Sequence, residues 1–259
     1  MNSKKEVLDT RKYEQMIHDA EASDYDRAIV SEHGMKHKYF TTAIWAKKFH
    51  EPFLDYGCGT GVASIVLARM NRKVVAFDIS PNMLAITRSK VPDVQVVVAD
   101  ALNLPFKDRS FPTICITGVL HHILDLDAAF AEICRCAKDV VCINEPSTTP
   151  PHIIVRLIKP FIRIATPVAR PIYYILKNRG KKGSQMRYSG SIYERPLDPS
   201  ELKELLRSHS FEIIGERYFN HIPFLHLFLP EQIRRYIFQA LIHPKKGTHV
   251  EIIAMRKTS

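Results

Sequence analysis

The chain has 259 residues, of which 46% are hydrophobic and 25% are charged, and this balance excludes a disordered or fibrous protein. Lysine and arginine outnumber aspartate and glutamate by 37 to 27, which gives a formal net charge of +10. The excess lies in one segment, because residues 148–190 carry 9 basic and no acidic residues whereas residues 1–147 carry 18 basic and 19 acidic ones. The first half therefore offers no broad basic face for a nucleic acid duplex.

The five cysteines include no Cys-x-x-Cys pair, and a chain of this length can bury enough apolar surface to fold without disulfides. The N-terminus begins Met-Asn-Ser-Lys-Lys-Glu and continues without the apolar stretch of a signal peptide. We therefore expect reduced cysteines and a cytoplasmic protein.

The first half of the chain predicts helices followed by an α/β alternation. Residues 1–50 show a helical, amphipathic pattern, and we expect them to form a helical cap at one end of a sheet. From residue 51 short β-like runs alternate with helical runs, which is the pattern of a parallel sheet with crossover helices. One helix has a clear start, with Ser80 as N-cap and Pro81 at the first helical position. The sequence predicts strands at 53–56, 73–77, 94–98, 112–116 and 140–143, and helices at 61–71, 81–90 and 126–137.

Residues 148–190 break this alternation, because apolar residues there are interleaved with basic residues and prolines. These basic groups and prolines exclude a membrane-spanning helix. Asp198, Pro199 and Glu201 then mark the start of a helix that runs to about residue 208. The remaining predicted elements are a strand at 211–219, a helix at 230–242 and a strand at 249–255. This pattern divides the chain into an N-terminal helical cap (1–50), a core (51–147), a basic apolar lid insert (148–197) and a C-terminal completion of the sheet (198–259).

The most informative stretch is the glycine-rich loop LDYGCGTG, residues 54–61, between the first strand and the next helix. Glycines let the backbone turn sharply and approach a ligand, and free N–H groups at a helix start favour bound polar or anionic groups. The spacing is G-x-G-x-G and differs from the dinucleotide pattern G-x-G-x-x-G. A tight strand-to-helix turn without a ligand is the alternative explanation.

An acidic residue ends each of the next two strands. Asp78 lies where a carboxylate can accept hydrogen bonds from both ribose hydroxyls of a nucleoside. Asp100, followed by Ala101, could accept a hydrogen bond from an exocyclic adenine amine. Each acid alone could be a solvated loop residue or a helix cap. Together with the glycine loop, however, they fall at successive strand ends, where open α/β sheets bind their ligands, and so predict a nucleoside site.

With these motifs the sequence resembles a class I S-adenosylmethionine (SAM)-dependent methyltransferase of the small-molecule group, which includes quinone-biosynthesis and natural-product enzymes. The resemblance implies a seven-stranded doubly wound, Rossmann-like α/β sheet with residues 51–147 as the SAM-binding core. It also implies SAM as the cofactor and S-adenosylhomocysteine as the product. The matching segments are LDYGCGTG (54–61), FDIS (77–80), ADALNLPF (99–106) and ITGVLHHI (116–123).

The resemblance further implies a role for each matching residue. Asp55 would order the loop near the methionine amino group, to which Thr117 would offer its backbone carbonyl. Asp78 would hold the ribose, while Asp100 and the Ala101 N–H would bind the adenine. The other contacts that the resemblance implies are the loop residues Gly57, Cys58, Gly59 and Gly61, with Ile79 and Met83 beside the adenine and Tyr25 over the cofactor. Ordinary packing explains the last two side chains equally well.

Methyl transfer from a sulfonium is an in-line displacement whose leaving group needs no protonation, so a base is required only when the acceptor must lose a proton. His121 and His122 follow the fourth strand, near the methyl group by the resemblance, and we favour His122 as the base. Glu145, after the fifth strand, is the other acid–base candidate. Capping, packing or loop hydrogen bonds are the alternative roles of these three residues. No ligand set has the spacing of a metal site, and we expect no metal.

Two absences narrow the acceptor. The fourth strand is not followed by Asn/Asp-Pro-Pro-Tyr/Phe, which relatives use to grip a planar amine, and the Pro-Cys loop of pyrimidine-C5 enzymes is missing. We therefore expect a small lipophilic or amphiphilic acceptor, methylated at O, C or N. An RNA methyltransferase that uses the basic insert, and a catalytically inert, membrane-peripheral SAM-binding protein, are the alternatives. The sequence does not indicate an oligomeric state.

The insert at 148–190 falls where relatives place a lid over the acceptor pocket. It has three explanations: a lid with a solvated basic face, an amphipathic segment at the inner face of a membrane, or an electropositive mouth for an anionic acceptor. The second would make the cytoplasmic enzyme a peripheral membrane protein.

Overall fold

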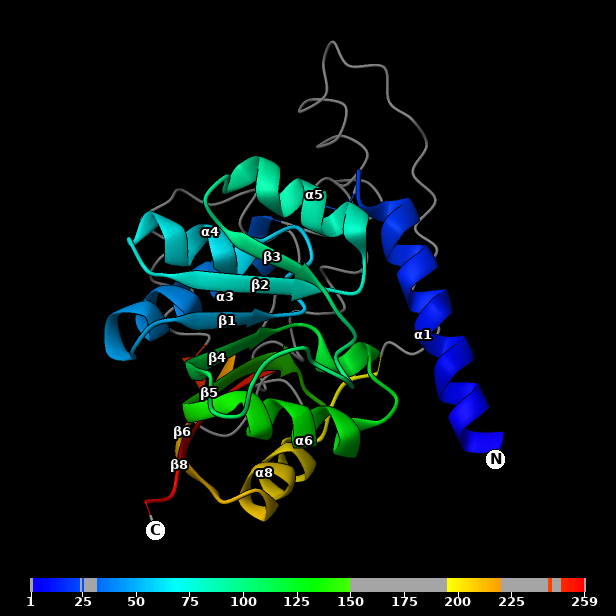
Figure 1. Cartoon of the computed structure of the whole chain (residues 1–259). Coiled ribbons are helices and arrows are strands. Elements are labelled where there is room, and N and C mark those ends of the chain that lie inside the picture. The colour runs from blue at the N-terminus through cyan, green and yellow to red at the C-terminus, as the bar shows by residue number, and fades with distance from the viewer. Residues whose placement is uncertain are drawn as a thin grey trace, which may run out of the picture.

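The computed structural model describes residues 2–23, 25, 32–149, 195–219, 242–243 and 248–258. Within these ranges one mixed sheet has the strand order β3-β2-β1-β4-β5-β8-β6-β7, with helices on both faces (Figure 1). The seven-stranded doubly wound sheet is thus confirmed, and the two-residue β7 extends it at one edge. The strands are β1 (Phe53–Tyr56), β2 (Val74–Asp78), β3 (Gln95–Val98), β4 (Phe111–Thr117), β5 (Ala137–Pro146), β6 (Phe211–Phe219), β7 (Ile242–His243) and β8 (His249–Arg256).

The direction in which successive strands are added to the sheet reverses beside β1, and this reversal creates the position for a ligand. From β1 the chain moves outward through β2 to β3 and then returns to β4, which pairs in parallel with the other side of β1. In doubly wound sheets ligands bind outside the carboxyl ends of the strands at such a switch point. The helices are α1 (Asn2–Glu21), α3 (Glu32–Lys48), α4 (Val62–Arg69), α5 (Pro81–Lys90), α6 (Leu126–Cys136) and α8 (Pro199–Ser208), with a 3-10 turn η1 (Leu120–His122).

Alternate residues of the central strands face opposite layers, as the period of a β-strand requires. Leu54 and Tyr56 of β1 pack in a cluster with α6 and α8, whereas Phe53 packs with α3 and α4. Helix α5 shares the second face with α4, so the sheet is the middle of three layers. All five cysteines are buried and free.

The capping signals predicted two helix starts correctly. The Ser80 side chain accepts a hydrogen bond from the Met83 N–H at 3.1 Å at the start of α5. Asp198 accepts one from the Ser200 N–H at 2.9 Å at the start of α8. The predicted helix at 230–242 lies outside the described residues except for Ile242, which pairs with β6 in a strand and not a helix.

The N-terminal helices occupy two different places. Helix α1 lies beyond the carboxyl ends of the strands (Figure 1), whereas α3 packs on a face of the sheet through Trp45, Ala46 and Phe49. The Trp45 Nε1–H donates to the buried Glu251 of β8 at 2.8 Å, which fixes α3 to the antiparallel part of the sheet. No helix in the described part of the chain has the length and apolar character needed to cross a bilayer, and almost all of the insert at 148–190 lies outside that part.

Candidate active site

The glycine-rich loop between β1 and α4 needs glycine because its backbone is left-handed and close to a neighbour. Gly57 has a φ of +61°, and a Cβ there would lie 2.5 Å from the Val119 Cγ1. Gly59 has a φ of +53°, but a Cβ there would meet nothing within 4 Å. The loop is thus held tightly against the turn after β4 at one point and faces open space at the other.

Asp55 ties the end of β1 to the start of α4. Its Oδ2 accepts hydrogen bonds from the Ser64 N–H at 2.9 Å and the Ser64 hydroxyl at 2.6 Å. Burial raises the pKa of Asp55 to about 6, against the opposing effect of these hydrogen bonds. The side chain orders the loop from behind and does not line the pocket.

Asp78, at the end of β2, links the glycine loop to the next crossover helix. Its Oδ2 accepts from the Gly59 N–H at 2.8 Å, and its Oδ1 accepts from the Ser80 N–H at 2.9 Å. Burial raises the pKa of this carboxyl. The side chain nevertheless lines the pocket, so a fixed acceptor faces the cavity at the position that the sequence predicted.

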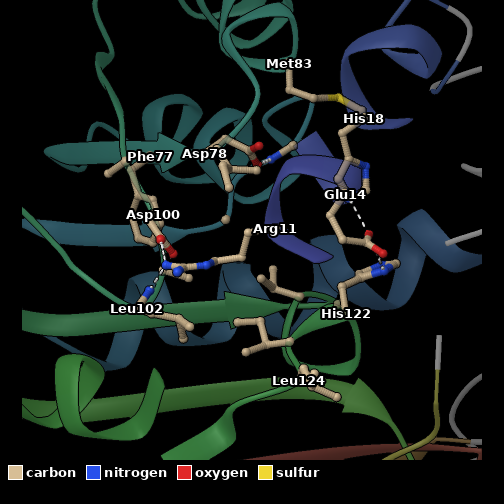
Figure 2. A pocket seen from close by; sticks show the side chains of 18 of the residues that line it. Arg11, Glu14, His18, Phe77, Asp78, Met83, Asp100, Leu102, His122 and Leu124 are labelled. Carbon is tan, nitrogen blue, oxygen red and sulfur yellow. Dashed lines mark hydrogen bonds and ion pairs between the residues drawn. The ribbon is translucent and has the colours of Figure 1, made fainter. Parts of the chain in front are cut away.

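Asp100 follows β3 and has a partner that the sequence did not indicate. Its Oδ1 accepts from the Leu102 N–H at 2.9 Å, and its Oδ2 is ion-paired with Arg11 of α1. Figure 2 shows Arg11 reaching across the pocket to this carboxylate. The N-terminal helix is thereby connected to the end of β3.

These groups surround a cavity of about 120 Å³ at the carboxyl ends of the parallel strands (Figure 2). Of the residues expected around the cofactor, four do not line it: Asp55, Cys58, Gly61 and Thr117. The Cys58 N–H donates to the Phe77 carbonyl at 2.8 Å, so this part of the loop belongs to the wall behind the cavity. The expected residues that do line it are Tyr25, Gly57, Gly59, Asp78, Ile79, Met83, Asp100 and Ala101.

The three acid–base candidates separate into two groups. Glu145 is fully buried, and it accepts hydrogen bonds from the backbone N–H groups of Val119 and Leu120 at 2.7 and 3.0 Å. Its other oxygen lies 2.8 Å from the His121 Nδ1, so Glu145 and His121 hold the turn after β4 and do not line the cavity. His122 does line it, and burial together with the neighbouring His121 lowers the pKa of His122 to about 2.

A buried amine lies behind the same turn. The Lys38 ammonium donates to the Thr117 carbonyl at 3.1 Å. Burial lowers its pKa, although the carboxylates of Glu145 and Asp55 act in the opposite direction. The sequence analysis missed Lys38, because no local pattern distinguishes it from the other lysines of α3.

Comparison with known proteins identifies the core of the chain. Residues 54–140, which include the glycine loop and both strand-end acids, match the family model of a methyltransferase domain. The chain contains a methyltransferase domain. This match agrees with the resemblance to class I SAM-dependent methyltransferases of the small-molecule group that the motifs predicted.

Its sequence relatives support this family. The methyltransferase is 28% identical over 172 residues to the demethylmenaquinone methyltransferase of Streptomyces avermitilis, covering 64% of this chain and 71% of the relative. It is 39% identical over 88 residues to the demethylmenaquinone methyltransferase of Corynebacterium glutamicum strain R, covering 34% of this chain and 37% of that relative.

Solved structures confirm the fold of the methyltransferase. The magnesium protoporphyrin IX methyltransferase of Synechocystis PCC 6803, with bound S-adenosylhomocysteine, has a TM-score of 0.62 at 14% identity and covers 96% of this chain and 100% of its own. A SAM-dependent methyltransferase from Archaeoglobus fulgidus has a TM-score of 0.56 at 16% identity, and the match covers 90% of this chain and 97% of that structure.

Proposed function

We propose that the methyltransferase transfers a methyl group from SAM to a small lipophilic or amphiphilic acceptor in the pocket beyond β1, β2 and β4. The observation that carries this proposal is the convergence of Gly57, Asp78 and Asp100 on one cavity whose wall also includes Ile123 and Leu124. The name of the sequence relatives supplies the first acceptor to test, demethylmenaquinone. This molecule is a lipophilic quinone, so the apolar wall is consistent with it.

The residues around the cavity fit the charged and polar parts of SAM. Asp78 faces the cavity with both oxygens already fixed by backbone donors, which suits two ribose hydroxyls. One oxygen of Asp100 is paired with Arg11 and could exchange this partner for the adenine amine. Asp55, Lys38 and Thr117 lie behind the cavity wall. There Asp55 binds Ser64 and the Lys38 ammonium donates to the Thr117 carbonyl, so these groups would order the loops around the methionine part of SAM.

Bound SAM supplies an electrophilic methyl group on a sulfonium. The protein would align the acceptor with this methyl group and exclude water. His122, neutral in the pocket wall, would accept a hydrogen bond from an acceptor hydroxyl. Its low pKa makes it a weak base, so orientation of the acceptor is its main role, and His121 and Glu145 position the turn that carries it.

We extend the proposal to the organisation of the chain. Residues 51–147 together with 198–259 would form the catalytic unit, residues 1–50 would cover its cofactor side, and the basic apolar insert at 148–197 would border the acceptor entrance. A basic apolar insert suits peripheral contact of a cytoplasmic enzyme with an anionic membrane surface, where a lipophilic acceptor would dissolve. Nucleic acid is not favoured as a partner.

Calorimetric titration of the protein with SAM, and with S-adenosylhomocysteine, tests the cofactor site. Asp78→Ala removes two hydrogen bonds to a charged acceptor, each worth about 1.5–3 kcal/mol, so SAM affinity should fall about 100-fold or more. Asp78→Asn, which keeps one acceptor oxygen, should lose less. Asp93→Asn removes an exposed carboxylate away from the pocket and is the matched control.

Formation of S-adenosylhomocysteine with demethylmenaquinone that has been reduced to its quinol, in detergent micelles, tests the acceptor class. Release of product above the rate without acceptor supports the proposal.

In the calorimetric titration, SAM affinity that is the same for Asp78→Ala and the native chain would refute the assignment of the cofactor site.

A further inference from the structure

We propose that the side chains of Glu14, His18 and His122 form a binding site for one transition-metal dication, with Zn²⁺ as the first candidate, on the wall of the pocket. Glu14 and His18 lie one turn apart on α1, and His122 is in η1 after β4. Figure 2 shows the three side chains pointing toward one another beside the cavity. All three residues line that cavity.

The distances favour a shared cation over direct hydrogen bonds. The Glu14 Oε2 lies 3.6 Å from the His18 Nε2 and 3.8 Å from the His122 Nδ1, both too long for a hydrogen bond, which ends near 3.2 Å. One ligand atom from each residue lies within 4.8 Å of the other two. Ligands about 2.0–2.1 Å from one metal are separated by about 3.3 Å in a tetrahedron and about 4.2 Å across an octahedron, so small side-chain movements would complete the site.

The chemistry of the three donors points to the same class of ion. Two imidazole nitrogens with one carboxylate oxygen are typical ligands of catalytic zinc, whereas Mg²⁺ and Ca²⁺ prefer oxygen alone. The His122 Nδ1 is buried and has no hydrogen-bond partner among the described residues. A buried ring nitrogen without a hydrogen-bond partner is a suitable position for a metal ligand.

The surrounding charges are compatible with a dication. Glu14 is buried at 7% exposure and supplies a negative charge. Among the described residues around the pocket, Arg11 is paired with Asp100 and the Lys38 ammonium donates to the Thr117 carbonyl. The sequence did not indicate this set, because its ligands come from two distant segments of the chain. We expected no metal from the spacing of ligand residues along the chain alone.

The site deepens the proposed function and rests on it in one respect. Three protein ligands leave coordination positions open toward the pocket, as in catalytic zinc sites. With its Nδ1 on a dication, His122 would carry its proton on Nε2 and would no longer accept a hydrogen bond from the acceptor. The dication would take over that role, because it would bind an oxygen of the acceptor and lower the pKa of its hydroxyl group. The site therefore favours acceptors that carry a hydroxyl or keto oxygen next to the methylated atom.

Titration of tag-free, chelator-stripped protein with CoCl₂ and with ZnCl₂ tests the site without reference to activity. Co²⁺ should bind once per chain and give the visible absorption of a low-coordinate nitrogen and oxygen site, which Zn²⁺ should then displace. Glu14→Gln and His18→Ala should each weaken Zn²⁺ binding about tenfold or more. His50→Ala, which removes an exposed histidine away from the pocket, should leave Zn²⁺ binding unchanged.

Melting temperature and SAM affinity are measured on the same samples, so that loss of metal binding is separated from loss of the fold. Zn²⁺ should raise the melting temperature of the native chain and not that of the folded variants. Absence of a stoichiometric site in the native chain, or unchanged binding in both variants, would overturn the metal site. Failure to bind SAM with metal binding intact would instead overturn the proposed function.

Discussion

Replacement of Asp55 by Asn tests whether the carboxylate behind the glycine loop destabilises the fold at neutral pH. Asp55 is 1% exposed, and burial raises its pKa from 3.8 to about 6. A carboxyl whose pKa is raised in the folded state binds its proton more tightly there than in the unfolded chain. Its contribution to stability is therefore complete below pH 4 and is lost as the pH rises through 6.

The size of the effect follows from the two pKa values. A difference of about two units corresponds to about 3 kcal/mol over the whole range, of which about 1.4 kcal/mol is lost between pH 5 and pH 7.5. An amide oxygen can still accept both hydrogen bonds from Ser64, and the amide does not ionise. The free energy of unfolding of Asp55→Asn, relative to the native chain, should therefore rise by about 1.4 kcal/mol from pH 5 to pH 7.5.

Urea unfolding at several pH values between 5 and 7.5 measures this difference, with the single tryptophan, Trp45, as a buried fluorescent probe. Far-UV circular dichroism should give the same midpoints. Asp93→Asn, in an exposed loop, should follow the pH dependence of the native chain. A difference between Asp55→Asn and the native chain that stays constant with pH would refute the argument.

Two further substitutions test contacts of the loop and of α3. Gly57→Ala should lower both the melting temperature and the SAM affinity more than Gly59→Ala, because both require a left-handed residue but only the first brings a Cβ against Val119; equal effects in calorimetry would contradict this. Trp45→Phe should cost about 1–3 kcal/mol of unfolding free energy, because the buried Glu251 loses a hydrogen-bond donor. A melting temperature unchanged from the native chain would show that this hydrogen bond is dispensable.

The fold was predictable where local signals specify it. Ser80 and Pro81 begin a helix through contacts within four residues. Each residue of β1 is buried because this strand lies between β2 and β4 in the sheet. Asp78 and Asp100 could be placed near each other without coordinates, because parallel strands bring their carboxyl ends to one edge. Their separation along the sequence was no obstacle.

The remainder of the site depends on packing between distant segments. Arg11 and Lys38 reach the pocket region only because α1 lies beyond the strand ends and α3 packs on a face of the sheet, and a helical pattern does not determine these placements. The adjacent histidines illustrate the same limit. His121 turns away because Glu145 of the neighbouring strand binds its Nδ1, and this leaves His122 toward the cavity.

The ion pair between Arg11 and Asp100 has a consequence for how the enzyme responds to salt. Where Asp100 binds the adenine amine, as proposed, Arg11 is a competitor tethered in the same chain. Both side chains are about 30% exposed, so the pair is worth at most about 1 kcal/mol, and displacing it weakens SAM binding only a fewfold. Added salt screens such a pair. Moderate ionic strength should therefore relieve this internal competition at the adenine end of the pocket.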